Sequence, residues 1–328
     1  MRLGGQARYA AGVASPEEVA AAHTWARERQ LPVRMVGSGS NIVWRDEGFA
    51  GLLIVNRLSG FEVAGEDDTG VTLVIGSGES WDTVVARTVE RGWTGIEALS
   101  LIPGTAGATP IQNVGAYGQD IAQTLVSVDA YDTQTGAFIT IPANECAFGY
   151  RSSRFKTIDN GRFLITAITL HLAKGNPQPP FYMGLQKYFD THHITSFTPQ
   201  VVRDAVIAIR SAKLPDPRTV ANNGSFFANP VVDGDTAIHF RASHPDAPTW
   251  PAADGRTKIS AAWLIEQAGL KDYHDPATGM ATWPTQPLVL VNEAAKSTAD
   301  LLAFKHTIVN AVAAKFNITL EQEPELLP

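Results

Sequence analysis

Apolar residues recur at helical spacing in several segments, and most of these segments begin with residues that cap helices. Ser15-Pro16-Glu17-Glu18 places a Ser cap before Pro in the first turn and Glu at the third helical position. Ser297 is followed three residues later by Asp300, which is a second capping pattern. The predicted helices run from Ser15 to Gln30, from Ser80 to Gly92, from Thr198 to Pro215, from Ile259 to Gly269 and from Ser297 to Phe316.

Short runs rich in β-branched and aliphatic residues lie between these helices and predict buried strands. Two of the runs flank the turn-forming segment Asp132–Gly136 and predict an antiparallel hairpin. The mixture, with more strands in the N-terminal half, predicts an α+β fold. The predicted strands are Val33–Val36, Gly51–Asn56, Val71–Ile75, Leu125–Tyr131, Ala137–Ile141 and Phe163–Leu172.

Composition narrows the class of protein. The 328 residues include 26 Lys and Arg against 33 Asp and Glu, which gives a net charge of -7 and disfavours nucleic acid or a membrane surface as a partner. The single cysteine, Cys146, excludes an internal disulfide framework, and without C-x-x-C or H-E-x-x-H no metal site is expected. No run is long and apolar enough for a membrane span, so we expect a cytoplasmic protein.

Gly95–Gly118 is rich in glycine and almost uncharged, so it fits neither an amphipathic helix nor a solvated loop. Backbone of this kind either approaches a cofactor closely or forms a pair of tight turns between buried strands. Its composition alone favours neither reading.

A second glycine-rich segment, Gly37–Asn41, follows a predicted strand. It lacks the third glycine of a dinucleotide fingerprint, because Ile42 stands there, and it lacks the Lys-Ser/Thr pair of a phosphate-binding P-loop. Two readings remain: a neutral phosphate cradle of backbone N–H groups and hydroxyls, or a plain turn.

Taken together, the motifs resemble one family along nearly the whole chain. The chain is similar to the MurB family of UDP-N-acetylenolpyruvoylglucosamine reductases, and the segment around Tyr182 resembles a loop of the longer, type I members. A composition break at Lys174–Pro180, rich in Pro and Gly, precedes that loop and is the expected domain boundary. The motifs are Gly37–Asn41, Ile102–Gly118, Cys146–Lys156, Asn223–Pro230, Lys258–Lys271 and Phe316–Glu323.

The resemblance implies a fold and a reaction. It implies a two-lobed FAD-binding domain of the vanillyl-alcohol-oxidase/PCMH type with a smaller α+β substrate domain. The expected parts are residues 1–56 and 57–173 as the two lobes, 174–218 as the tyrosine-loop insertion with a connecting helix, and 219–328 as the substrate domain. The expected activity is NADPH-dependent reduction of UDP-N-acetylglucosamine enolpyruvate through non-covalent FAD, in a monomer.

Three residues match the catalytic positions of the family. Arg151 matches the arginine that holds the substrate carboxylate, a task that suits the fork of a guanidinium. Ser225 matches the proton donor, and Glu323 matches the terminal acid, with Glu325 as the alternative. An ion pair, a turn serine and a solvated tail are the ordinary roles of such residues.

Binding positions follow from the same motifs. Trp250 stands where the type I members often have Tyr, so no hydroxyl contact is expected there. Cys146 is expected to be a small buried side chain. For FAD the resemblance implies Gly37, Ser38, Gly39, Ser40, Asn41, Ile102, Pro103, Gly104, Thr105, Gln112, Asn113, Gly115 and Tyr117, and for substrate Tyr150, Tyr182, Lys213, Asn229 and Lys258.

Two other functions are compatible with parts of this pattern. A flavin oxidase of the same superfamily would share the FAD-binding motifs, but not Arg151, Ser225 and Glu323 as a set. A non-catalytic binder of flavin or nucleotide sugar would have no need of the proton donor.

Overall fold

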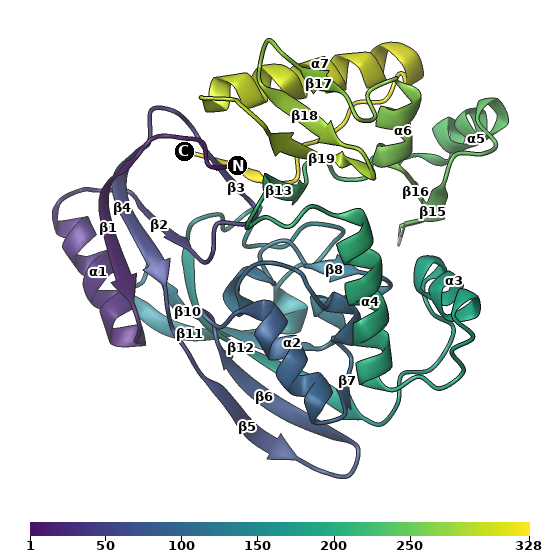
Figure 1. Cartoon of the computed structure of the whole chain (residues 1–328). Helices are drawn as coiled ribbons and strands as arrows, with labels where there is room; N and C mark the ends of the chain where they lie inside the picture. Colours follow the sequence, from purple (N-terminus) through teal and green to yellow (C-terminus); the bar gives the residue numbers. More distant parts are fainter. Residues whose placement is uncertain (253) are drawn as a thin grey trace. The chain divides into compact units, whose positions relative to one another are not determined.

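The computed structural model describes residues 1–252 and 254–328, which form two compact units (Figure 1). The large unit comprises Ala7–Ser40 and Ala50–Ala212. The small unit comprises Met1–Gln6, Asn41–Phe49 and Lys213–Pro328, so it combines both ends of the chain with a short internal segment.

The first sheet of the large unit carries one helix on its face (Figure 1). The strand order is β1-β4-β2, with β1 at Ala7–Val13, β4 at Phe49–Asn56 and β2 at Val33–Val36. Helix α1, Pro16–Glu28, packs Val19 and Ala26 against this sheet. Ser15 caps it as predicted, by accepting a hydrogen bond from the Glu18 N–H. The helix ends before Gln30, whose φ of 54° leaves the helical region.

A larger antiparallel sheet forms the main core of the large unit. Its strand order is β11-β10-β12-β6-β5, and the short β7 also pairs with β12. The predicted hairpin is confirmed, because Val128 faces Ile141 across β10 and β11. The bounds are β5 Phe61–Glu66, β6 Gly70–Gly76, α2 Trp81–Glu90, β7 Trp93–Thr94, β10 Leu125–Asp132, β11 Ala137–Pro142 and β12 Phe163–Lys174.

Short elements connect the strands of this core. They are the strands β8 Gly115–Ala116 and β9 Gln119–Asp120, and the 3-10 turns Glu97–Leu99, Ala106–Ala108, Ile121–Gln123 and Ala143–Glu145. Cys146 follows the last of these turns. It is fully buried as expected, and burial raises the pKa of its thiol to about 11.

Two helices complete the large unit, α3 at Met183–Thr191 and α4 at Pro199–Lys213. The sequence prediction of a loop around Tyr182 was wrong beyond that residue, because α3 begins at Met183. The reason is packing. Leu185 and Phe189 of α3 are buried against Val202 and Val206 of α4.

The small unit is built around a four-stranded sheet, with the order β13-β19-β18-β17, and three helices. The predicted capping box of α7 is confirmed by the reciprocal hydrogen bonds of Ser297 and Asp300. Helix α6 begins two residues later than expected, because Ser260 is its cap. The bounds are β3 Ile42–Trp44, β13 Ala221–Ser225, β14 Val231–Val232, α5 Gly234–Ser243, β15 Thr249–Pro251, β16 Thr257–Ile259, α6 Ala261–Gln267, β17 His274–Asp275, β18 Met280–Trp283, β19 Gln286–Asn292, α7 Thr298–Phe316 and β20 Glu325–Leu327.

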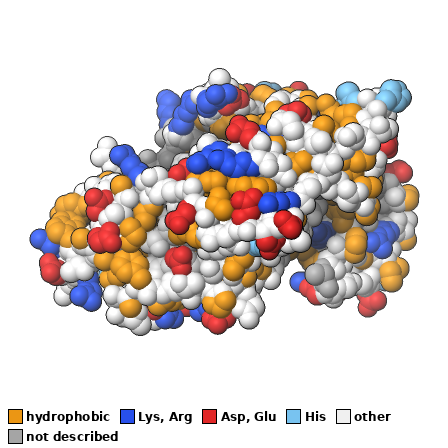
Figure 2. Space-filling model, turned by 90° about the horizontal axis from the view of Figure 1, so that it is seen from below, with side chains coloured by type: hydrophobic (Ala, Val, Ile, Leu, Met, Phe, Trp, Pro, Cys, Tyr) orange, Lys and Arg blue, Asp and Glu red, His pale blue; other side chains and the backbone are white. Residues whose placement is uncertain are grey.

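The surface is mixed in character. Acidic, basic and apolar side chains are interspersed over the face drawn in Figure 2. Within residues 1–252 and 254–328, no helix is both long and apolar enough to cross a membrane.

Candidate active site

Two glycine-rich loops of the large unit lie against each other. Ser40 Oγ donates a hydrogen bond of 3.2 Å to the carbonyl of Pro103. A Cβ atom added at Gly37 would lie 2.2 Å from Thr105 Oγ1, so no residue other than glycine fits there without separating the loops. Gly39 has a φ of 72° and open space beside its Cα. The two loops therefore form a bare backbone surface with room for a ligand.

The second loop is fixed to the start of α2. The Trp81 N–H donates to the carbonyl of Gly104 at 3.1 Å, and the Ala106 N–H donates to the carbonyl of Glu79 at 2.9 Å. Ser80 and Thr105 form an isolated β-bridge between these two bonds. These contacts hold the loop of Ile102 to Thr105 in one conformation.

A tight hairpin follows in the same stretch. Strands β8 and β9 pair Ala116 with Gln119, and the two residues between them, Tyr117 and Gly118, have φ values of 50° and 88°. Two central residues with positive φ define a type I′ turn, which usually has Asn or Gly first. The hairpin thus presents a tyrosine at its tip in a conformation that tyrosine seldom adopts.

Arg151 reaches this hairpin from a second tight turn. Gly149 and Ser152 exchange backbone hydrogen bonds of 3.0 and 3.2 Å, which leaves Tyr150 and Arg151 at the tip of the turn. Arg151 Nη2 donates to the carbonyl of Gly115 at 2.8 Å. The proposed carboxylate-binding arginine and the glycine-rich stretch are therefore in contact.

Two further side chains of that stretch are engaged in hydrogen bonds. Asn113 is buried, donates from Nδ2 to the Gly149 carbonyl at 3.3 Å and accepts from the Ala122 N–H at 3.1 Å. Gln112 Oε1 accepts from Lys156 Nζ at 3.4 Å. Asn113 therefore joins the two turns, and Gln112 is tied to the Cys146–Lys156 motif.

Tyrosine side chains gather beside the hairpin. The rings of Tyr117 and Tyr182 meet edge to face, with centroids 6.0 Å apart. Burial raises the pKa of Tyr182, and the nearby Tyr150 adds to that shift. Burial also raises the pKa of Tyr117, and the neighbouring Arg210 of α4 opposes this shift. The structure thus brings Tyr117, an FAD-binding candidate, beside the substrate-binding candidate Tyr182, with Tyr150 nearby.

Ser225 and Glu323 are neighbours in the small unit. Ser225 ends β13 directly after a bulge that contains Gly224, which has a φ of 67°. The Phe226 carbonyl accepts a hydrogen bond of 2.9 Å from the Glu323 N–H, and Phe227 forms a β-bridge with Gln322. The proposed proton donor and the proposed terminal acid therefore lie on adjacent, hydrogen-bonded segments.

Glu325 belongs to a different pairing. Its N–H donates to the Asn41 carbonyl at 3.0 Å, and it begins β20, which runs parallel to β3. The backbone therefore places Glu323, rather than Glu325, beside the Ser225 segment.

Of the remaining substrate candidates, all in the small unit, two lie on neighbouring segments and the third lies at the end of α4. Asn229 Oδ1 accepts the Ala261 N–H at 2.9 Å, and Lys258 lies on β16 opposite Trp250 and Val231. Lys213 is exposed at the end of α4, and its carbonyl accepts a hydrogen bond from Thr285. Asn229 and Lys258 are close in the fold, since the Ile259 N–H donates to Pro230, the residue after Asn229.

Comparison with known proteins identifies the family. Residues 7–141 match the model of an FAD binding domain, and residues 216–327 match the UDP-N-acetylenolpyruvoylglucosamine reductase C-terminal domain. The chain is 41% identical over 323 residues to the UDP-N-acetylenolpyruvoylglucosamine reductase of Burkholderia vietnamiensis, a match that covers 98% of this chain and 92% of that protein. The chain belongs to the MurB family.

A second MurB relative and a solved structure agree with this assignment. The UDP-N-acetylenolpyruvoylglucosamine reductase of Ralstonia nicotianae is 40% identical over 329 residues, which is 99% of this chain and 95% of that protein. The MurB crystal structure from Thermus caldophilus superposes with a TM-score of 0.66 at 21% identity and covers 97% of this chain and 92% of that one. The predicted α+β fold with an FAD-binding domain and a MurB C-terminal domain is confirmed.

The loops of the MurB chain fit FAD. A dinucleotide carries a diphosphate, and backbone without side chains lets phosphate oxygens approach N–H groups. Gly37 and Gly39 supply such backbone, and both lie within the matched FAD binding domain. Among the described residues, no cluster of three His, Cys, Asp or Glu side chains could hold a metal ion.

Two residues beside the MurB site were missed by the sequence analysis. Arg210 contacts Tyr117. The sequence feature that could have drawn attention to it is its position seven residues after Arg203, which places both arginines on one face of α4. Glu97 is buried next to the hairpin. The sequence feature that could have drawn attention to it is that it is the one charged residue in Gly95–Gly118.

Proposed function

We propose that the protein reduces UDP-N-acetylglucosamine enolpyruvate to UDP-N-acetylmuramate with NADPH, in the synthesis of peptidoglycan precursors. Membership of the MurB family supports the activity, and the pairing of the Ser225 and Glu323 segments is the observation that carries the mechanism. When bound in the glycine-rich loops, FAD would supply the hydride chemistry that links NADPH to C3 of the enolpyruvyl group. The protein's own residues then have to manage the charge and the proton at the adjacent carbons.

Arg151 binds the substrate carboxylate in this proposal. Hydride addition at C3 builds negative charge at C2 and on the attached carboxylate, so a fixed cation there favours the transition state. The hydrogen bond to the Gly115 carbonyl and the tight turn of Gly149 to Ser152 support a fixed position for the guanidinium. A guanidinium can bind both carboxylate oxygens at once, which a lysine cannot.

Ser225 donates the proton to C2, and Glu323 stabilises the charge that develops there. A hydroxyl is a weak acid, so the step requires a strongly basic carbon and exclusion of water. Glu323, held by its backbone beside Phe226, suits a second acidic group near the same carbon. The proton added at C2 and the hydride added at C3 together reduce the double bond.

In this proposal, the remaining candidate residues bind FAD and the UDP-sugar substrate. The loops of Gly37 to Asn41 and of Ile102 to Thr105 hold FAD, together with Gln112, Asn113, Gly115 and Tyr117. The substrate is held by Tyr150, Tyr182, Lys213, Asn229 and Lys258. Apart from Met1–Gln6 and Asn41–Phe49, which belong to the small unit, residues 1–173 act as the two FAD lobes, and residues 219–328 act as the substrate domain. The protein is a cytoplasmic monomer without covalent flavin in this proposal.

Steady-state oxidation of NADPH tests the function. The FAD-loaded protein is expected to oxidise NADPH continuously only when UDP-N-acetylglucosamine enolpyruvate is added, with one sugar reduced per NADPH. Sustained oxygen consumption without the sugar would instead identify an oxidase. Bound flavin without turnover under either condition would identify a non-catalytic binder.

A further inference from the structure

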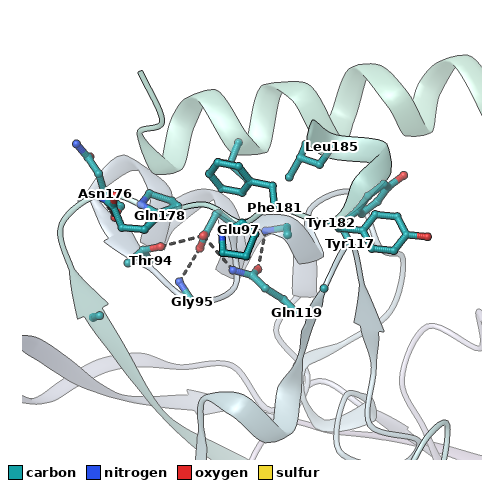
Figure 3. Close-up of a pocket in the computed structure, with 16 residues that line it drawn as sticks. Thr94, Gly95, Glu97, Tyr117, Gln119, Asn176, Gln178, Phe181, Tyr182 and Leu185 are labelled. Carbon is teal, nitrogen blue, oxygen red and sulfur yellow. Dashed lines mark hydrogen bonds between the residues drawn. The ribbon is translucent and has the colours of Figure 1, made fainter. Parts of the chain in front are cut away.

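Glu97 is a buried acid that the proposed mechanism does not use. Its exposed fraction is 2%, and it lies at the start of the 3-10 turn Glu97–Leu99 of the large unit. It borders a cavity of about 380 Å³, together with Tyr117, Phe181 and Tyr182 (Figure 3). A buried carboxylate is costly unless its oxygens are hydrogen-bonded, so its presence calls for a structural reason.

Neutral donors surround both carboxylate oxygens. Thr94 Oγ1 and Gln119 Nε2 donate to Oε1 at 2.8 and 3.0 Å, and the Gly95 N–H donates to Oε2 at 2.6 Å. Figure 3 shows these three groups directed at the carboxylate. Gln119 also accepts the Ala98 N–H at 2.8 Å, so its amide is bonded both to the Glu97 carboxylate and to the backbone of the next residue. We call this set of contacts the Glu97 clamp.

The Glu97 clamp holds the hairpin that forms part of the active site. Gln119 pairs with Ala116 across β8 and β9, which are two residues long each, and Tyr117 is at the tip. An isolated hairpin this short is not stable in water. The same hairpin offers the Gly115 carbonyl to Arg151. A hydrogen-bonded path therefore runs from Glu97 through Gln119 and the hairpin to Arg151.

We propose that Glu97 is a positioning residue for the reduction: its carboxylate fixes the β8–β9 hairpin so that Arg151 and Tyr117 are held in their working positions. The proposal rests on the proposed function, because it assumes that Arg151 binds the substrate carboxylate. It assigns Glu97 no contact with the substrate or the flavin.

The variant Glu97→Gln tests the proposal with little change in volume. An amide retains one acceptor oxygen and replaces the other by a donor, which must then face the Gly95 N–H or the two donors at Oε1. We expect kcat/KM for the enolpyruvyl sugar to fall by about 10²-fold, the scale of an ångström-sized displacement of a positioning group. The matched control is Asp132→Asn, which alters a carboxylate that is 1% exposed and bound by Arg162 elsewhere in the large unit.

A double-mutant comparison of Glu97 with Arg151 distinguishes a positioning role of Glu97 from a simple loss of protein stability. The effects of Glu97→Gln and Arg151→Lys on kcat/KM should be non-additive, because the first change already displaces the group altered by the second. Asp132→Asn and Arg151→Lys should act independently. Additive effects of Glu97→Gln and Arg151→Lys on kcat/KM would overturn the proposal. So would a fall in kcat/KM for Glu97→Gln that is no larger than the fall for Asp132→Asn when both variants lose the same amount of thermal midpoint temperature.

A double variant in which Glu97 and Gln119 exchange their side chains supplies a second test. Glu97→Gln combined with Gln119→Glu restores a carboxylate opposite an amide, and it should recover at least tenfold of the lost kcat/KM. A folded exchange variant whose kcat/KM stays about 10²-fold below that of the unaltered protein would contradict positioning. This comparison holds even if Glu97→Gln alone does not fold. Absence of sugar-dependent turnover in the unaltered enzyme would reject the proposed function instead.

Discussion

Gly37 shows how one missing side chain shapes the cofactor site. Because a Cβ atom there would lie 2.2 Å from Thr105 Oγ1, Gly37→Ala should push the two glycine-rich loops apart. We expect at least about tenfold weaker FAD binding, since backbone donors lose their alignment. Equilibrium fluorescence titration of the flavin measures this. Gly65→Ala is the control, because nothing lies within 4 Å of a Cβ there, and equal affinities of the two variants would contradict the account.

A second single residue, His23, makes the stability of the folded protein depend on pH. It is 8% exposed, and its Nδ1 has no hydrogen-bond partner within the described part of the chain. Burial, and then the Arg27 charge, lower its pKa below the usual value of 6.5. The unfolded chain therefore takes up the proton first as pH falls, and stability is lost below about pH 6.5.

Replacement of His23 by a side chain that does not titrate should remove this loss of stability at low pH. Between pH 7.5 and 5.5, His23→Leu should lose less unfolding free energy than the unaltered protein, by at most about 1.4 kcal/mol per pH unit. Urea unfolding at the two pH values is the measurement. Identical pH dependence in both proteins would show that His23 does not contribute.

At the scale of elements, an ion pair joins two helices of the large unit. Arg203 of α4 donates to both carboxylate oxygens of Asp82 on α2, at 2.6 and 3.1 Å, and Asp82 also accepts the Leu101 N–H. Removal of the guanidinium leaves a partly buried carboxylate without its strongest donor. Arg203→Ala should therefore lower the free energy of unfolding by about 1–3 kcal/mol.

An exposed pair of the same type is the control for that experiment. Arg218 binds Asp216, but its side chain is 89% exposed. Arg218→Ala should lower the unfolding free energy far less than Arg203→Ala does, because water replaces the contact. Equal losses for the two variants in chemical denaturation would argue against a role for the α2–α4 contact.

Elements with local signals could be predicted from the sequence, and elements set by distant contacts could not. Ser15 and Ser297 announce their helices through residues only three positions away. The 3-10 turn of Glu97 depends on Gln119, 22 residues later, and the contact of Arg151 with Gly115 spans 36 residues. The family motifs pointed to Arg151 as a candidate, whereas the local sign of Glu97 was only that it is the one charged residue in Gly95–Gly118.

For the whole molecule, the sequence indicated the class but not how the segments combine. Composition predicted a domain boundary at Lys174–Pro180, but the large unit continues through this segment to Ala212, because α3 and α4 pack on each other within that unit. Composition also carried no sign that Asn41–Phe49 joins the C-terminal part, since that depends on the parallel pairing of β3 with β20. A three-residue pairing between Ile42–Trp44 and Glu325–Leu327 has no sequence pattern to reveal it.

Binding of the whole dinucleotide should stabilise the molecule. FAD at a concentration 100-fold above its dissociation constant should add about 2.7 kcal/mol to the free energy of unfolding. Riboflavin, which lacks the diphosphate, should add much less, because the glycine-rich loops are proposed to bind phosphate oxygens. Differential scanning calorimetry of the flavin-free protein with each ligand compares them, and equal shifts would contradict a diphosphate cradle.

The role of Ser225 as the proton donor at C2 is the central claim, and anaerobic stopped-flow kinetics of Ser225→Ala tests it most directly. Flavin reduction by NADPH should stay within about threefold of the unaltered rate, while oxidation of the reduced enzyme by the enolpyruvyl sugar should slow by at least about 10²-fold. Ser297→Ala, which removes only the cap of α7, should leave both rates unchanged. Reoxidation of Ser225→Ala by the sugar at the unaltered rate would show that Ser225 is a turn residue and not the acid.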